Sequence, residues 1–142
     1  MGYLIGQVAR KTGLSAYTLR YYEKEGLLPF IRKNGAGLRV FSDEDIGWLS
    51  MIECLKETGM SLKEIRQYID WYQEGDGTLD KRLKMFEEQK RNLETKLDNL
   101  QKNMKKIAYK IKLYEEAVRL GSLDKAHQNE KLREEGKKLF GH

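Results

Sequence analysis

The chain has 142 residues, of which 35% are charged and 39% hydrophobic, and it carries a net charge of +5. This length fits one domain, or one small domain with an extension, and no stretch approaches the ~20 apolar residues of a membrane-spanning helix. The single cysteine, Cys54, excludes an internal disulfide and a metal site built on two cysteines. The first residues lack the basic and apolar segments of a signal peptide, so we expect a cytoplasmic protein without a membrane partner.

The charge is unevenly distributed along the chain. Residues 1–40 carry seven Lys/Arg and two Asp/Glu, residues 41–78 carry three and nine, and residues 79–142 carry seventeen and eleven. A basic first segment indicates a polyanionic partner such as DNA. A solvated surface that happens to be basic is the alternative, and charge alone does not separate the two.

The first segment has the spacing of a helix-turn-helix. A short helix is predicted over residues 5–11 and a second over residues 16–25, which ends at Gly26. Between them, Thr12-Gly13-Leu14-Ser15 predicts a tight turn that ends in a good N-cap residue. Residues 29–37 contain a proline and two glycines, which indicates a loop or a small β-hairpin.

Two capping boxes predict two further helices. Ser42-Asp43-Glu44-Asp45 places acidic residues in the first turn of a helix that ends at Gly59. Ser61-Leu62-Lys63-Glu64 opens the next helix, which ends at Gly75-Asp76-Gly77.

A long helix follows, because residues 78–120 contain no glycine and no proline. Its apolar residues alternate at spacings of four and three over more than five heptads, which is typical of a coiled coil. At 1.5 Å per residue the helix is about 60 Å long, too long to bury this stripe on a domain of roughly 75 residues, so it needs a second copy of the chain. We call the stripe the heptad seam; only Lys90 interrupts it, and its members are Leu79, Leu83, Phe86, Leu93, Leu97, Leu100, Met104, Ile107, Ile111, Tyr114 and Val118.

The predicted fold is therefore all-α with a small β wing. A winged helix-turn-helix domain (residues 1–77) precedes a coiled-coil dimerisation helix (residues 78–120) and a charged tail (residues 121–142). Charges beside the seam do not decide whether the two helices run parallel or antiparallel, because exposed ion pairs contribute only ~0–1 kcal/mol. The tail reads as a short helix or as disordered chain, and its weak periodicity favours a frayed tail.

The second helix of a helix-turn-helix reads base edges in the major groove. Arg20 is expected to pair with guanine or phosphate, and the tyrosines to contact phosphates and sugars. Helical spacing must turn some positions inward, so core packing is an equal alternative for Tyr22. The candidate DNA-binding residues of this helix are Ser15, Tyr17, Thr18, Arg20, Tyr21 and Tyr22.

The segment after this helix adds positive charge. Gly35 and Gly37 permit a tight turn, which would let Arg32, Lys33 and Arg39 flank a DNA backbone as a wing. An ordinary basic surface loop is the alternative.

Residues 3–72 resemble the DNA-binding domain of the MerR family of bacterial transcription regulators. One departure is Leu38, where many members of the family carry a tyrosine in the wing. The matching segments are Ile5-Gly6-Gln7-Val8-Ala9, Thr12-Gly13-Leu14-Ser15, Thr18-Leu19-Arg20-Tyr21-Tyr22-Glu23, Gly26-Leu27-Leu28-Pro29, Gly37-Leu38-Arg39-Val40-Phe41-Ser42-Asp43-Glu44-Asp45 and Gly59-Met60-Ser61-Leu62-Lys63-Glu64-Ile65.

The resemblance implies a homodimer, formed through residues 79–118, that binds a near-palindromic operator in an over-long promoter spacer. Such dimers bend and untwist double-stranded DNA so that RNA polymerase engages both promoter elements, which is an indirect partnership with the polymerase. The family's second wing lies at the turn before the fourth helix, so Ser61 and Lys63 become candidate phosphate contacts. Ordinary capping by Ser61 and a solvated Lys63 are the alternatives.

Cys54 is the candidate for sensing a signal. Its segment resembles a MerR subgroup that responds to aldehydes and other electrophiles through one cysteine in this helix. Reactivity requires an exposed thiol with a lowered pKa, and a buried, inert cysteine is the alternative. No cofactor and no metal are expected, because His127 and His142 make no plausible ligand set.

Three classes of protein compete for this sequence. An enzyme is disfavoured, because two tail histidines, one cysteine and no glycine-rich phosphate loop give no catalytic constellation. A coiled-coil scaffold with a small helical head explains the seam but not the basic helix-turn-helix and wing. A dimeric DNA-binding transcription regulator explains all three features and is the predicted function.

Overall fold

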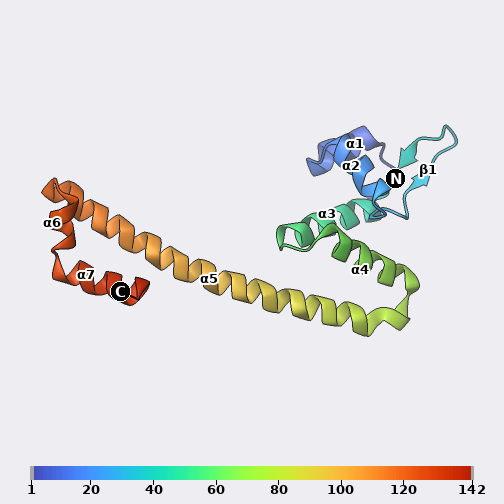
Figure 1. The fold of residues 1–142 in the computed structure, drawn as a ribbon. Coiled ribbons are helices and arrows are strands. Elements are labelled where there is room, and N and C mark those ends of the chain that lie inside the picture. Colours follow the sequence, from blue (N-terminus) through green and yellow to red (C-terminus); the bar gives the residue numbers. More distant parts are fainter. Residues whose placement is uncertain (1, 142) are drawn as a thin grey trace. The chain divides into compact units, whose positions relative to one another are not determined.

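The computed structural model describes residues 2–141, and in this part of the chain it is helical apart from one two-stranded hairpin (Figure 1). Two compact units divide at Gln89 and Lys90, inside the longest helix. The sequence prediction of an all-α fold with a small β wing is confirmed. The elements are α1 (Ile5–Thr12), α2 (Ala16–Lys24), β1 (Arg32–Lys33), β2 (Arg39–Val40), α3 (Asp43–Glu57), α4 (Leu62–Glu74), the 3-10 turn η1 (Asp76–Thr78), α5 (Leu79–Leu120), α6 (Leu123–His127) and α7 (Glu130–Phe140).

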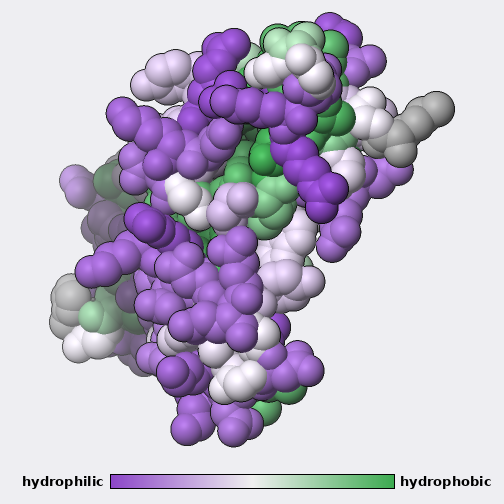
Figure 2. Space-filling model, turned by 90° about the vertical axis from the view of Figure 1, so that its right-hand side faces the viewer, coloured by the Kyte–Doolittle hydropathy of each residue, from purple (hydrophilic) through white to green (hydrophobic). Residues whose placement is uncertain are grey.

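The N-terminal unit, up to Gln89, has one apolar core built by α1, α2, α3 and α4. In α2, α3 and α4 the buried apolar members recur three or four residues apart, which places them on one face of each helix. Full burial of a side chain of this size contributes roughly 1.5–3 kcal/mol. The largest fully buried side chains are Val8, Leu19, Tyr22, Leu27, Leu28, Phe41, Leu49, Ile52, Ile65 and Ile69. On the face drawn in Figure 2, hydrophilic side chains form most of the surface.

The first turns of α5 pack on the N-terminal unit through an aromatic cluster. Trp48 lies 5.5 Å from Phe30 and 4.7 Å from Tyr72, measured between ring centroids, and Tyr68 lies 5.0 Å from Phe86 of α5. Three residues further on, the Gln89 side-chain amide donates a hydrogen bond to the Thr58 carbonyl at 2.8 Å. These contacts explain why the compact units divide within α5 and not at its start.

Helix ends lie where the sequence places them, because capping groups are present. In α3, Ser42 Oγ accepts a hydrogen bond from the Asp45 N–H, and an Asp45 carboxylate oxygen accepts one from the Ser42 N–H. Ser61 and Glu64 form the same box at α4. Gly59 follows α3 with φ 94°, a left-handed conformation that glycine adopts readily.

Most of the heptad seam is exposed in this single chain. Phe86 is an exception, because it packs on Tyr68. Within the C-terminal unit, seven seam side chains are between 53% and 81% exposed: Leu97, Leu100, Met104, Ile107, Ile111, Tyr114 and Val118.

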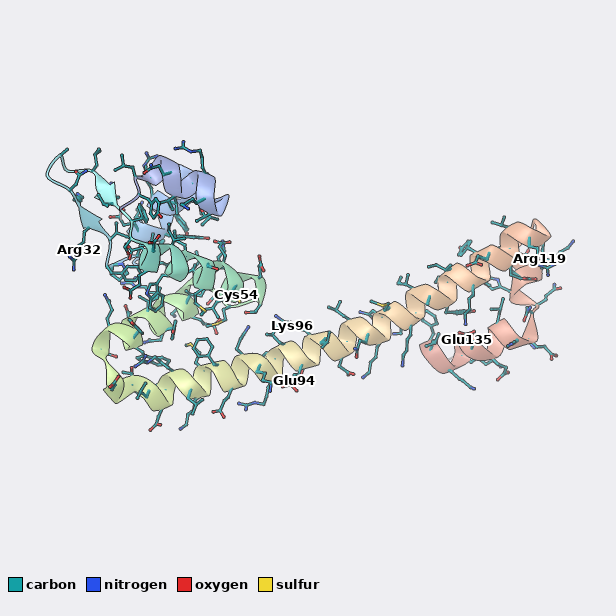
Figure 3. All side chains as sticks on the ribbon, turned by 180° about the vertical axis from the view of Figure 1, so that it is seen from behind. Arg32, Cys54, Glu94, Lys96, Arg119 and Glu135 are labelled. Atoms are coloured by element: carbon teal, nitrogen blue, oxygen red, sulfur yellow. The ribbon has the colours of Figure 1, made fainter. Side chains whose placement is uncertain are left out.

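The tail is not frayed, so this part of the sequence prediction is wrong. Helices α6 and α7 fold back on the end of α5 (Figures 1 and 3), and Leu113, Ala117 and Ala126 are buried with Leu132 packed against them. Ser122 and Asn129 cap these two helices by accepting hydrogen bonds from backbone N–H groups. Glu135, labelled in Figure 3, accepts a hydrogen bond from Lys112 of α5 at 3.0 Å. Burial of a few apolar side chains and good caps therefore stabilise helices whose periodicity is weak.

The tail covers a different face of α5 from the seam. Tyr109, Leu113 and Ala117 are buried, whereas Ile111 and Tyr114 are exposed. At about 100° per residue, the centres of these two faces lie roughly 130° apart around the helix. The C-terminal unit therefore leaves the seam open to another chain.

Candidate nucleic-acid interface

The helix-turn-helix is built from local capping interactions. Gly13 ends α1 with φ 77°, and its N–H donates to the Ala9 carbonyl. Thr12 Oγ1 donates to the Val8 carbonyl at 2.8 Å and accepts from the Leu14 N–H at 3.2 Å. These hydrogen bonds satisfy backbone polar groups at the end of α1 and stabilise the turn that sets the angle between α1 and α2.

The outer face of α2 carries most of the predicted DNA-binding residues. Tyr17 is 77% exposed, Tyr21 is 41% exposed, and Arg20 is exposed beside them. Ser15 caps the helix by accepting from the Thr18 N–H, and its hydroxyl lies 3.0 Å from that of Thr18. This face presents a guanidinium, two phenols and two hydroxyls, the groups that contact phosphates and base edges.

Tyr22 does not belong to this face. Only 1% of the residue is exposed, so the alternative of core packing is the one that the structure shows. Its hydroxyl donates to Glu53 Oε1 at 2.5 Å and accepts from Lys56 Nζ at 2.6 Å. Burial and the hydrogen bond to Glu53 raise the pKa of the Tyr22 phenol, and the bond to Tyr22 raises the pKa of Lys56. Tyr22 thus remains a neutral donor that ties α2 to α3.

The hairpin carries two exposed cations and contacts α2 through a third. Strands β1 and β2 pair antiparallel, with Arg32 opposite Val40 and Lys33 opposite Arg39. Arg32 and Lys33 are exposed, whereas Arg39 is half-buried in an ion pair with Glu23 of α2. This ion pair joins the hairpin to α2. Asn34 closes the loop by accepting from the N–H groups of Ala36 and Leu38.

A groove of about 420 Å³ runs between α1, α2 and the hairpin. Three arginines line it, Arg10, Arg20 and Arg39. Sequence reasoning missed Arg10, because it considered only the second helix of the motif. The signal that Arg10 shares with Arg20 is its position on an exposed face of a helix-turn-helix helix.

The second predicted phosphate site is capped by the protein itself. Ser61 Oγ accepts from the Glu64 N–H at 3.1 Å and donates to Glu64 Oε1 at 3.0 Å. The capping alternative for Ser61 is therefore the one that the structure shows, and the Glu64 carboxylate adds a negative charge at this helix start. Lys63 is exposed there.

Cys54 is exposed on α3 (Figure 3), which excludes the alternative of a buried cysteine. It lines an open pocket of about 500 Å³ with Lys11, Glu53 and Glu57. Lys11 would attract a thiolate, and the two carboxylates would repel it.

Other site types have no support in residues 2–141. No group of three or more His, Cys, Asp and Glu side chains there is placed to hold a metal ion. His142, considered above as a ligand, lies outside the described residues. Over the same range, no helix combines the length and apolar character needed to cross a membrane.

The helix-turn-helix, the hairpin beside it and the long helix after it define a winged helix-turn-helix regulator. A model of MerR HTH family regulatory proteins matches residues 3–70, and a MerR DNA-binding model matches residues 46–109. An HTH-type transcriptional regulator of Haemophilus influenzae is 43% identical over 123 residues, which make up 87% of this chain and 91% of the relative. The chain belongs to the MerR family, as its sequence motifs indicate, and this is a family of regulators and not of enzymes.

Two further similarities bear on the site. The crystal structure of HiNmlR, described as a MerR family regulator lacking the sensor domain and bound to promoter DNA, matches with a TM-score of 0.82 at 43% identity, covering 87% of this chain and 98% of that one. The HTH-type transcriptional regulator AdhR of Bacillus subtilis is 37% identical over 63% of this chain and 64% of its own length.

Replacing Tyr22 with Phe separates the core role of this residue from a role on DNA. The change removes two hydrogen bonds to partly exposed partners, so we expect unfolding to become easier by about 1 kcal/mol. Urea denaturation followed by circular dichroism measures this loss. Tyr17→Phe is the control, because an exposed site should change stability by less than about 0.5 kcal/mol. Unchanged stability together with a tenfold loss of promoter binding (roughly 1.4 kcal/mol) would return Tyr22 to the DNA interface.

Proposed function

We propose that this protein regulates transcription by binding a near-palindromic operator in promoter DNA as a homodimer. The observation that carries the proposal is the convergence of Arg10, Arg20 and Arg39 in one groove beside the exposed face of α2. The similarity to HiNmlR, whose crystal structure is described as bound to promoter DNA, supports the same partner for this chain. A regulator with this partner works in the cytoplasm.

Each part of the interface has a role. Arg20 reads a base edge or a phosphate from the major groove, with Ser15, Tyr17, Thr18 and Tyr21 beside it. The hairpin cations Arg32 and Lys33, together with Arg39, contact the DNA backbone. Exposed Lys63 adds a backbone contact at the start of α4. Backbone contacts fix the position of the protein and make binding dependent on salt.

The second protomer packs on the heptad seam. Seven exposed apolar side chains on one face of α5 support this interface, and the tail covers another face. Two DNA-binding units joined in this way read two half-sites, which matches a near-palindromic operator.

The dimer acts on RNA polymerase indirectly, through the shape of the DNA. Bending and untwisting an over-long spacer costs deformation energy, which the backbone contacts of both protomers offset. The distorted spacer brings the two promoter elements into a relation that the polymerase recognises.

Cys54 senses aldehydes or related electrophiles. Its exposure and its open pocket give a small carbonyl compound access to the sulfur. The thiolate attacks the carbonyl carbon, a C–S bond forms, and the carbonyl oxygen takes the electron pair and then a proton. The product is a neutral hemithioacetal, whose formation is reversible.

The assignment of Arg20 is tested by Arg20→Ala, measured on DNA from upstream of the protein's own gene. We expect loss of specific binding without loss of the fold, and a shallower dependence of affinity on salt. Arg91→Ala, at an exposed position of α5, removes the same charge and should change affinity less than threefold. If Arg20→Ala also stays within about threefold, below 1 kcal/mol, the role of Arg20 is wrong. Wild-type protein that shows no salt-dependent DNA binding would favour the scaffold alternative.

The seam is tested with the double variant Ile107→Asp and Ile111→Asp. Two carboxylates in an apolar interface are strongly unfavourable, so we expect a monomer at concentrations where the wild type is a dimer. Sedimentation velocity measures this difference. Thr95→Asp, on the opposite side of α5, is the control and should remain dimeric. A double variant that stays dimeric would place the interface elsewhere, and a monomeric wild type would refute the dimer.

Sensing is tested with Cys54→Ser in a promoter–reporter assay with formaldehyde. We expect operator affinity within about threefold of wild type and no response to the aldehyde, because a hydroxyl is a far weaker nucleophile than a thiolate. Ser50→Ala changes another residue of the same pocket and should keep the response. An undiminished response in Cys54→Ser would locate sensing at another site.

A further inference from the structure

A second pocket lies in the C-terminal unit, between α5, α6 and α7. Its volume is about 390 Å³, within the range of roughly 300–1,000 Å³ typical of sites for small molecules. None of its lining residues takes part in the proposed DNA interface, and none belongs to the heptad seam. The pocket is therefore a candidate site distinct from the DNA interface and from the seam.

The floor of the pocket is apolar and closely packed. The rings of Tyr109 and Phe140 meet edge to face, with centroids 5.9 Å apart. Helix α7 approaches Tyr109 through Gly136, where a Cβ atom would lie 2.6 Å from the Tyr109 hydroxyl oxygen. A glycine inside a helix costs about 0.5–1 kcal/mol relative to alanine, and here it permits this close approach. The close packing of Tyr109, Gly136 and Phe140 therefore gives the pocket a defined apolar floor.

The rim of the pocket is cationic. Lys110, Arg133 and Lys137 line it together with His127, and no Asp or Glu does. The Lys110 ammonium lies 5.3 Å from the centroid of the Phe140 ring, so it is held over the floor. Among residues 2–141, neither Lys110 nor Arg133 forms an ion pair with a carboxylate, whereas Lys137 lies 3.9 Å from Glu134. Two cations at this rim are therefore available to an anion.

We propose that this pocket binds a small organic anion, a carboxylate, sulfonate or phosphate ester on an aromatic or aliphatic body. The apolar body lies on Tyr109 and Phe140, and the anionic group pairs with Lys110 and Arg133 in charge-assisted hydrogen bonds. A polyanion would not need the apolar floor, and it would contact the outer lysines of α7 equally well. The combination of floor and rim therefore favours a small amphiphilic anion.

The position of the pocket connects this ligand to the long helix. Lys110 directly precedes the seam residue Ile111, and Arg133 lies on α7. A ligand that pairs with both holds the tail to α5 at the level of the seam. This site is independent of DNA binding, so either proposal stands if the other fails.

The probe is 1-naphthyl phosphate, titrated calorimetrically into the full-length protein. We expect a dissociation constant below about 1 mM, with binding at least tenfold weaker for 1-naphthol and for inorganic phosphate, since each lacks one of the two required parts. Binding of 1-naphthol with equal affinity would show an apolar site only. Absence of binding up to several millimolar would refute the proposal outright.

Paired variants locate the binding. The double variant Lys110→Gln and Arg133→Gln should weaken 1-naphthyl phosphate at least tenfold (about 1.4 kcal/mol). Lys105→Gln with Lys131→Gln is the matched control, because it removes the same charge from the same two helices outside the pocket. The control should stay within about threefold of wild type. Equal losses in both double variants would indicate diffuse surface charge and would overturn the proposal. All four positions are exposed, and circular dichroism checks that helix content is unchanged.

Discussion

The heptad seam of α5 is the constraint on which the proposed assembly depends, because the chain does not cover it by itself. Seven apolar side chains of the C-terminal unit are more than half exposed along it. Burying a side chain of this size is worth roughly 1.5–3 kcal/mol, so a long exposed row is a strong drive to association. The tail has apolar residues of its own, yet it does not cover the seam. It packs on the other face of α5, which carries Leu113 and Ala117. One helix therefore keeps its intrachain packing and its proposed dimer contact on separate faces.

In the N-terminal unit, polar side-chain contacts join α2 to α3 and to the hairpin. Tyr22 of α2 bonds Glu53 and Lys56 of α3, and Arg39 of the hairpin pairs with Glu23 of α2. These contacts tie α2 to α3 and to the hairpin before any DNA is bound. A surface fixed in advance loses less conformational entropy on binding, which favours recognition by a few well-placed side chains.

Much of this architecture could be predicted from the sequence, because local signals agree with the tertiary structure. Capping boxes at Ser42 and Ser61 predict the starts of two helices, and the 4-3 spacing of apolar residues predicts the seam. The tail could not be predicted in this way, since its helices depend on burial of Ala126 and on the close approach of Gly136 to Tyr109. Such contacts join residues far apart in sequence and leave only a weak periodic signal.

The sequence predicts in part which side chains of the site face outward. Leu19 and Tyr22 are three residues apart and share the buried face of α2, whereas Tyr17 and Tyr21 do not. In α3 the buried positions Leu49, Ile52 and Leu55 turn Cys54 outward. The position of Arg10 in the groove could not be predicted from the sequence, because the groove forms only when the hairpin folds beside α1 and α2.

The neighbourhood of Cys54 gives the proposed sensor a short route to α2, the proposed DNA-reading helix. Glu53, the preceding residue, accepts the hydrogen bond of Tyr22, and both Cys54 and Glu53 line the same pocket. A ligand can shift a regulator between two states only by as much as its interactions with the two states differ. A typical intramolecular hydrogen bond contributes about 0.5–1.5 kcal/mol, and roughly 1.4 kcal/mol corresponds to a tenfold change in an equilibrium. An adduct on the sulfur that displaced Glu53 from Tyr22 would therefore shift an equilibrium that depends on this hydrogen bond several-fold.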